Sequence, residues 1–230
     1  CRVALASGNQ GPWRAMIDLT PFNPLARENL GASVAEAMLE KKAWPLANVV
    51  AKSFKGAGIY ALYYTGNFDA YGEIAVRNRD DRFEVPIYVG KAVPAGARKG
   101  NVGLGTAAGA VLWGRLKEHA ESINAASSTL KLEDLHCRLL IVDDIWIPLA
   151  ESLLISKFSP VWNKRIDGFG NHDPGKARYE GLRPMWDVLH PGRAWADKCQ
   201  SRSETAAQIA TDLKAYLKTA QVPAKPKLLG

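Results

Sequence analysis

Two runs of β-branched and aromatic residues stand out in the first half of the chain. One extends from Gly58 to Tyr64 and the other from Val85 to Val89, and runs of this composition and length are typical of strands. Alternate residues of a strand share a face, so in a paired sheet Tyr60 lies on one face and Tyr88 stands across from it. The pattern therefore predicts a sheet surface on which two phenols meet.

The spacing of apolar residues predicts two helices that carry polar side chains within or at the edge of their apolar faces. From Ala110 to Ile123 apolar residues recur every three or four positions, His119 falls inside that stripe, and Arg115 lies on its edge. The second helix, from Pro148 to Phe158, has a broad apolar arc with Glu151 at its border. A carboxylate there must reach solvent, pair with a cation or bind a metal, because burying it alone is costly.

Two further elements complete the predicted centre of the fold. The segment between the tyrosine strands, Thr65 to Pro86, alternates in polarity at residues 72 to 77 and has a turn signal at Asp80-Asp81, so it is predicted to be an extra hairpin. A strand is predicted from Leu135 to Val142, where apolar residues alternate.

Both ends of the chain are predicted to be helical. Short helices are predicted from Pro24 to Leu30 and from Ser33 to Lys42, and Ser33 with Glu36 has the form of a capping box. Near the other end, residues from Glu204 to Lys218 have one apolar face. The whole pattern predicts an α+β fold with a small sheet flanked by helices.

Composition narrows the class of partner. The apolar content of 47% in 230 residues is ample for a packed core, and the formal net charge of +7 points to a polyanionic partner, nucleic acid above all. The three cysteines are far apart, which argues against a disulfide framework or a zinc site. No apolar run approaches the roughly 20 residues of a membrane helix, so we expect a cytoplasmic protein with no membrane partner.

A glycine-rich segment follows Lys91 and carries Arg98. A phosphate-binding loop is disfavoured, because Ala92 follows Lys91 where such a loop has serine or threonine. The looser dinucleotide pattern beginning at Gly103 has no strand leading into it. A flexible basic loop is the prediction for this segment.

Five motifs follow one another along the chain: Gly58-Ile59-Tyr60, Tyr88-Val89-Gly90, Arg115, Glu151, and Pro160 followed by Asn163. Taken together, these ordered motifs resemble the GIY-YIG nuclease family over roughly residues 55 to 170. The tail at residues 168 to 175 and the flanking extensions look most like the branch of type II restriction endonucleases that cut GC-rich palindromic DNA. The chain departs from the wider family in two ways. The position four residues after Arg115 is usually tyrosine in the family, whereas here it is His119, as in that restriction branch. The gap between Gly58-Ile59-Tyr60 and Tyr88-Val89-Gly90 is also longer than usual.

The resemblance implies a fold, a division of the chain and an activity. The fold would be an α/β sandwich built on a small GIY-YIG sheet, with an inserted hairpin and helical extensions. Residues 1–50 would form an N-terminal helical arm, residues 51–181 the catalytic domain, and residues 182–230 a C-terminal extension with a helix and a loose tail. The activity would be metal-dependent hydrolysis of both strands of double-stranded DNA, most simply by a homodimer whose two-fold axis matches a palindrome.

The predicted chemistry assigns a role to each motif residue. Arg115 has a fixed charge suited to phosphate oxygens, and Glu151 is the predicted ligand of Mg²⁺ or Mn²⁺. A tyrosine with a pKa near 10 is a poor base, so Tyr60 would pass its proton to His119 while accepting one from water. The supporting residues would be Tyr88 and Lys91, which orient the water or phosphate, and Asn163, which holds Glu151 or Tyr60.

Several basic residues are predicted to contact DNA, by following the backbone or by reaching a base edge. His172-Asp173, before Pro174-Gly175, is interpreted as a turn and not as a second metal site. Two alternatives stay open: a repair or homing nuclease with the same catalytic domain, and a non-cutting DNA-binding protein, which would have no need of Glu151 near a phosphate. The candidate DNA-binding residues are Arg77, Arg79, Arg82, Arg98, Lys164, Arg165 and Arg178.

Overall fold

A four-stranded antiparallel sheet forms the centre of the computed structural model, which describes residues 23, 26–94, 109–175 and 178–220. The strand order is β1-β4-β2-β3, so β3 lies at one edge and β2 lies inside the sheet. All seven residues of β2 are buried, as expected for a strand covered on both faces. The strands are β1 (Trp44–Pro45), β2 (Gly58–Tyr64), β3 (Tyr88–Ala92) and β4 (Leu135–Ile141).

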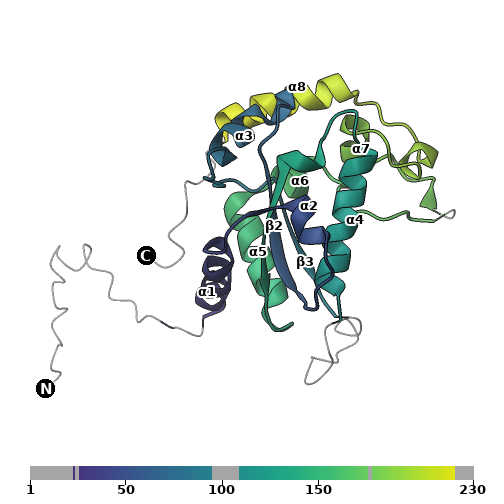
Figure 1. Ribbon diagram of the computed structural model, residues 1–230. Helices are drawn as coiled ribbons and strands as arrows, with labels where there is room; N and C mark the ends of the chain where they lie inside the picture. The colour runs from purple at the N-terminus through teal and green to yellow at the C-terminus, as the bar shows by residue number, and fades with distance from the viewer. Residues whose placement is uncertain (1–22, 24–25, 95–108, 176–177, 221–230) are drawn as a thin grey trace, which may run out of the picture.

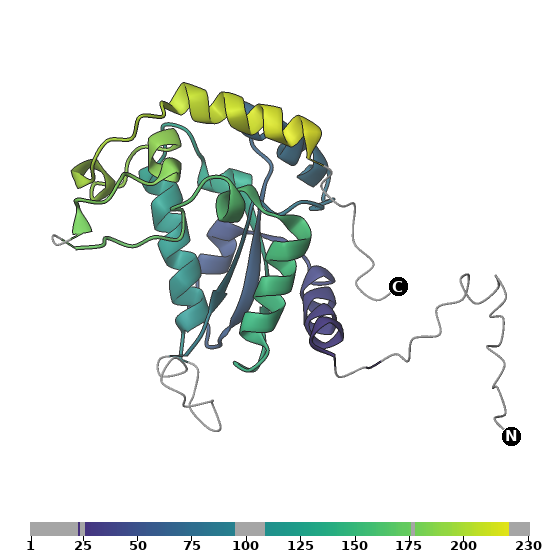
Figure 2. The same ribbon diagram turned by 180° about the vertical axis from the view of Figure 1, so that it is seen from behind.

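Two long helices cover the two faces of the sheet (Figures 1 and 2). Helix α4 (Val111–Ala125) packs on the face that carries Tyr60 and Leu62. Helix α5 (Ile147–Phe158) packs on the opposite face, and α1 (Arg27–Leu39) lies against the outer side of α5. The predicted α+β class, with helices on either side of a small sheet, is confirmed.

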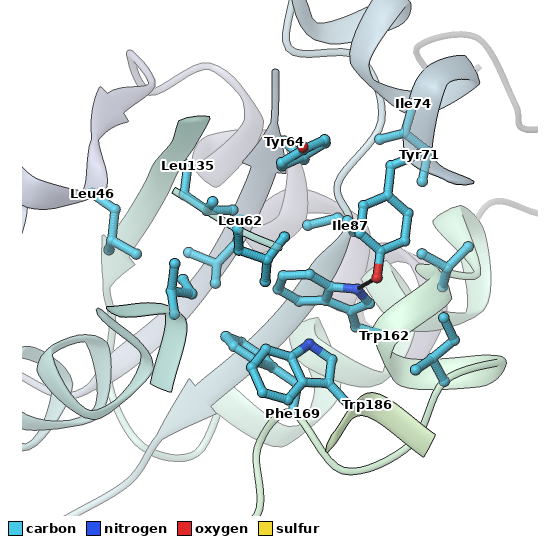
Figure 3. Packing of buried hydrophobic residues seen from close by; sticks show 14 of the residues in the cluster. Leu46, Leu62, Tyr64, Tyr71, Ile74, Ile87, Leu135, Trp162, Phe169 and Trp186 are labelled. Carbon is cyan, nitrogen blue, oxygen red and sulfur yellow. Dashed lines mark hydrogen bonds between the residues drawn. The ribbon is translucent and has the colours of Figure 1, made fainter. Parts of the chain in front are cut away.

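The C-terminal part of the chain adds a second group of aromatic residues to the core. Figure 3 shows Trp162 between Tyr71 and the rings of Phe169 and Trp186, and the indole of Trp162 donates a hydrogen bond of 2.8 Å to the Tyr71 hydroxyl. Helix α8 (Ala206–Thr219) crosses one end of the molecule next to α3 (Gly72–Asn78) (Figure 1). The remaining helices are α2 (Leu46–Val50), η2 (Asp69–Tyr71), α3 (Gly72–Asn78), η4 (Leu132–Asp134), α6 (Val161–Lys164), α7 (Met185–Leu189), η6 (Ala196–Lys198) and α8 (Ala206–Thr219).

The predicted hairpin between the tyrosine strands is wrong. That segment folds as the 3₁₀ turn η2 followed by helix α3. The buried residues Ile74, Ala75 and Asn78 recur at helical spacing, and a short run that alternates in polarity can satisfy either period. The Asn78 amide then pins the helix to the sheet, because it bonds the carbonyl of Tyr64 and both backbone groups of Val85.

The two predicted N-terminal helices are one helix, α1. Ser33 lies inside this helix, so the predicted capping box with Glu36 does not form, and the N-cap residue Ala26 makes no side-chain cap bond. Gly31, where the sequence pattern suggested a break, packs against α5: a Cβ there would lie 3.2 Å from Cγ of Leu149. The glycine therefore permits close helix packing instead of ending the helix.

The register of β2 and β3 also differs from the prediction. Tyr60 pairs with Gly90, and Tyr88 pairs with Leu62, so the two tyrosines are diagonal neighbours on one face instead of direct partners. Their ring centroids are 6.2 Å apart. The glycine opposite Tyr60 leaves space for the phenol, because a Cβ at position 90 would lie 2.4 Å from the Tyr60 hydroxyl.

Among the described helices, none is long and apolar enough to cross a membrane.

Candidate active site

The candidate active site lies at the sheet edge formed by β3, where side chains from both faces of the sheet meet. Tyr88 lies on the face covered by α4, and Lys91 on the face covered by α5. Arg115 approaches from α4 and Glu151 from α5. The edge therefore gathers groups that the sheet would otherwise keep apart. They line one pocket of about 630 Å³, formed by Tyr88, Lys91, Ala92, Val93, Val111, Gly114, Arg115, Glu118, Glu151, Gly170 and His172.

Tyr60 and His119 form a buried pair beside this pocket. The Tyr60 hydroxyl lies 2.6 Å from Nε2 of His119. Burial raises the pKa of Tyr60 well above 10, and burial, with the nearby Arg115 charge, lowers the pKa of His119 well below 6.5. At neutral pH the phenol is therefore protonated and the imidazole is neutral, and in the tautomer with its proton on Nδ1 the Nε2 atom accepts the hydrogen bond from the phenol.

Tyr88 completes a cluster of rings around this pair. Its ring centroid is 6.2 Å from that of Tyr60 and 5.3 Å from that of His119. Burial raises the pKa of Tyr88, while the positive charge of Arg115 acts in the opposite direction. The Tyr88 hydroxyl therefore stays protonated at neutral pH and can donate a hydrogen bond toward the pocket.

The Arg115 guanidinium is held by three groups. Its Nη1 atom lies 2.9 Å from a carboxylate oxygen of Glu118 and 2.6 Å from Nε2 of His172, and its Nη2 atom donates a 2.6 Å bond to the carbonyl of Gly170. Arginine remains charged at any physiological pH and presents a planar fork of donors. The arrangement therefore directs a permanent positive charge at the pocket.

Glu151 and Lys91 form an ion pair of 2.6 Å inside the pocket. The Glu151 side chain is 17% exposed and that of Lys91 is 37% exposed, so the carboxylate is accessible from the pocket. Among the described residues no group of three or more histidines, cysteines or carboxylates is arranged to hold a metal. The donor set suits an ion such as Mg²⁺, which keeps several waters and is commonly bound by one or two carboxylates.

Asn163 supports the edge strand. Its Oδ1 accepts a 2.8 Å bond from the backbone N–H of Val89, and its Nδ2 donates a 2.8 Å bond to the carbonyl of the same residue. The amide thus supplies the partners that another strand would otherwise provide at an open edge. In the structure these two bonds of the Asn163 amide go to Val89, and its role in holding Glu151 or Tyr60 stays a prediction.

A loop that sequence reasoning left without a catalytic role forms one wall of the site. The ring of Phe169 stacks on His119, with centroids 4.5 Å apart and an interplanar angle of 16°. Gly170 and His172 bond Arg115. The available signal was the glycine after Phe169: a Cβ at position 170 would lie 2.7 Å from the Tyr88 hydroxyl.

The interpretation of His172-Asp173 as a turn is confirmed for Asp173 only. Its Oδ1 accepts a 2.8 Å bond from the backbone N–H of Gly175, as in a turn closed by an aspartate. His172 instead extends to Arg115, so it belongs to the lining of the pocket.

Those predicted DNA-binding residues that the structure describes do not line this pocket. Arg77 pairs with Glu84, and Arg79 and Arg82 donate to backbone carbonyls of their own segment. Lys164 and Arg178 are exposed, and Arg165 lies 3.9 Å from the ring centre of Tyr216. Arg98 and the glycine-rich segment up to residue 108 fall outside the described residues. Contact with DNA remains a prediction for all seven.

Replacing Gly90 by alanine tests the packing of the two tyrosines. The added Cβ would meet the Tyr60 hydroxyl at 2.4 Å and a ring carbon of Tyr88 at 2.9 Å, so both rings must shift. A shift of about 1 Å in reacting groups lowers rates by about 10²-fold, and we expect a loss of that size in the single-turnover rate of the DNA cleavage that the resemblance implies. The matched control is Gly72→Ala at the start of α3, where nothing lies within 4 Å of the added atom. An active Gly90→Ala protein would contradict the assignment of these rings to the site.

The chain was compared with models of known protein families. Residues 52–217 match the family model of the Eco29kI GIY-YIG domain. A search of curated proteins gave no match.

Proposed function

The chain belongs to the Eco29kI GIY-YIG family, a type II restriction endonuclease family, and on this premise we propose that it cleaves both strands of double-stranded DNA at a specific site. Membership of the family implies a DNA endonuclease. The specificity that we propose is for a GC-rich palindrome, on the basis of the tail at residues 168–175 and of His119 in the place of tyrosine. The division into an arm (1–50), a catalytic domain (51–181) and a C-terminal extension (182–230) is part of the same proposal.

The observation that carries the proposal is the buried hydrogen bond between Tyr60 and His119. Hydrolysis of a phosphodiester needs a base that removes a proton from water as the water attacks phosphorus. A neutral imidazole at 2.6 Å can take the phenolic proton while the Tyr60 oxygen accepts one from water. The pair therefore gives the phenolic proton an acceptor within hydrogen-bond distance, which a tyrosine by itself lacks.

The remaining side chains of the pocket act on the substrate. The Arg115 guanidinium can bind two oxygens of the scissile phosphate through two parallel N–H donors. To do so, it would have to give up its hydrogen bond to Glu118 or to His172. Tyr88 and Lys91 lie next to it on β3 and orient the attacking water or the phosphate. Such fixed donors stabilise charge most where water is excluded.

A divalent metal, Mg²⁺ or Mn²⁺, is the proposed cofactor, with Glu151 as its protein ligand. GIY-YIG nucleases generally use a divalent metal, and the Glu151 carboxylate in the pocket fits an ion that keeps most of its waters. When bound, the ion would stabilise the negative charge that develops on the leaving 3′ oxygen. Lys91 neutralises the same carboxylate through its 2.6 Å ion pair.

Cleavage of two strands by one site per chain is most simply done by a homodimer on DNA. A two-fold protein matches the two-fold symmetry of a palindrome. The exposed side chains of Lys164 and Arg178, together with Arg165, are proposed to follow the backbone. Light scattering of the complex with a duplex tests this part, and a mass equal to one chain per duplex would contradict it.

Incubation of phage or plasmid DNA with the protein, with Mg²⁺ or with a chelator, tests the function. We expect discrete fragments in the presence of Mg²⁺ and none with the chelator. Sequencing of the fragment ends then gives the site, the cut position and the end type. DNA retarded in a gel but left uncut under both conditions would favour a non-cutting DNA-binding protein. Cuts confined to long asymmetric sites or to damaged DNA would favour the homing or repair alternative.

A further inference from the structure

A buried ion pair lies behind the wall of the active site. Arg193 binds the carboxylate of Asp187 with both ends of its fork: Nε lies 2.6 Å from Oδ1 and Nη2 lies 2.5 Å from Oδ2. The side chains are 5% and 1% exposed. The rings of Trp186 and Trp195 lie within 4.7 Å of the guanidinium carbon. The arginine is thus held in a single orientation by charge and by packing.

The other donors of Arg193 all point to one loop. Nη1 donates to the carbonyls of Phe169 and Asn171 at 3.1 Å, and Nη2 donates to the carbonyl of Gly168 at 2.9 Å. A guanidinium has five N–H groups, and in this structure two go to Asp187 and three go to the loop. The guanidinium therefore ties residues 168–171 to α7.

The same loop contacts two residues of the proposed chemistry. Its Phe169 ring stacks on His119 at 4.5 Å, and its Gly170 carbonyl accepts a 2.6 Å bond from Nη2 of Arg115. The orientations of the arginine and of the imidazole both depend on where this loop lies. Arg193 itself does not line the pocket.

We propose that Arg193, paired with Asp187, is a positioning residue for DNA cleavage, which acts by holding loop 168–172 against Arg115 and His119. The inference rests on the proposed nuclease function and deepens it. A purely structural role is the competing explanation. Buried ion pairs often add little net stability compared with apolar residues of similar size, so the two roles can be separated by replacing the whole pair.

The main test variant combines Arg193→Met with Asp187→Leu, so that no charge is left buried without a partner. We expect a folded protein whose DNA affinity lies within a few-fold of the wild type and whose single-turnover cleavage rate is about 10²-fold lower. Arg193→Lys is the second variant: it keeps the charge, but one ammonium cannot replace the fork at a carboxylate and three carbonyls. This variant should fold, and its single-turnover cleavage rate should also be lower than that of the wild type. The matched control removes the surface ion pair of Arg183 and Asp197 (3.2 Å) in the same segment, and it should cut normally.

An Arg115→Lys background separates positioning from general damage. In that background the Arg115 guanidinium, which the loop orients, is already absent. Adding Arg193→Lys should therefore lower the cleavage rate by less than about tenfold. Losses that simply multiply both in this background and in a His119→Gln background would overturn the inference, and so would a normal cleavage rate in the folded pair variant, or rates that fall only in step with the folded fraction. If the wild-type chain itself cuts no DNA, the proposed function fails and the inference fails with it. A wild type that cuts and a variant that cuts equally well overturn the inference alone.

Discussion

Glu151→Gln is expected to lower DNA cleavage by about 10³-fold or more while DNA binding is retained. Glutamine keeps the size of the side chain but removes the charge that would hold a divalent ion, and a metal contributes several kcal/mol to stabilising charge in the transition state, where each 1.36 kcal/mol is tenfold in rate. Binding should not weaken, because a carboxylate near phosphates repels them. Single-turnover cleavage and gel retardation, both with Mg²⁺, give the two quantities.

The matched control for this variant is Glu121→Gln. Glu121 lies on α4, is exposed, and pairs only loosely with Lys117 at 3.7 Å, so its loss should leave cleavage unchanged. Cleavage by Glu151→Gln at the wild-type rate would remove Glu151 from the proposed metal site. Loss of binding together with cleavage would point instead to a defect in folding, which a thermal melt monitored by circular dichroism detects.

The second large effect is expected for His119→Ala, with a loss of about 10²- to 10⁴-fold in the single-turnover rate, the range typical of a proton-transfer group. Without the imidazole, the buried Tyr60 hydroxyl has no acceptor at 2.6 Å and keeps its proton. Tyr60→Phe should lose a similar factor. The cleavage rate of the double variant should be only slightly lower than that of the less active single variant, because the effects of groups that act as a unit do not add.

A control for the histidine is His136→Gln, on the opposite face of the sheet near Phe83, which should leave the rate unchanged. Equal activity of His119→Ala and the wild type would exclude the imidazole as proton acceptor. A double variant with multiplied losses would indicate that Tyr60 and His119 act separately.

The same pair sets the expected pH dependence. Because burial holds the pKa of His119 well below 6.5, the imidazole stays neutral as the pH falls from 8 to 6, and its ability to accept a proton is lost only below that range. The wild-type rate should therefore show no step at pH 6.5 that can be assigned to His119. A titration of the rate centred near 6.5 that disappears in His119→Gln would show that the imidazole is not desolvated during catalysis.

Much of the site was predictable from residue type and spacing. Arg115 and His119 stand four residues apart on one helix, and that spacing by itself places them on the same side of the helix. Glu151 stood out as a carboxylate on an apolar helix, and in the structure it meets Lys91. Local rules suffice for such features, because they depend only on helix and strand periodicity.

Other features depended on contacts between distant parts of the chain. Residues 72–77 fit both a strand and a helix, and the helix forms because Ile74 and Asn78 find partners in the core. The break expected near Gly31 was absent, because α5 packs closely against the helix at that position. The choice between two possible local structures is decided by which side chains become buried in the folded core, and a short stretch of sequence does not show this.

The sequence alone determined the order of the motifs, the class of the fold, and the side chains capable of the chemistry. Only the tertiary structure decided how they meet: β3 became an edge strand, so groups from α4 and α5 on opposite faces of the sheet reach one pocket. It also brought the loop at residues 168–172, and Arg193 behind it, against Arg115. These contacts join residues far apart in the chain, and their geometry follows from packing of the whole core, whereas the motifs follow from periodicities only a few residues long.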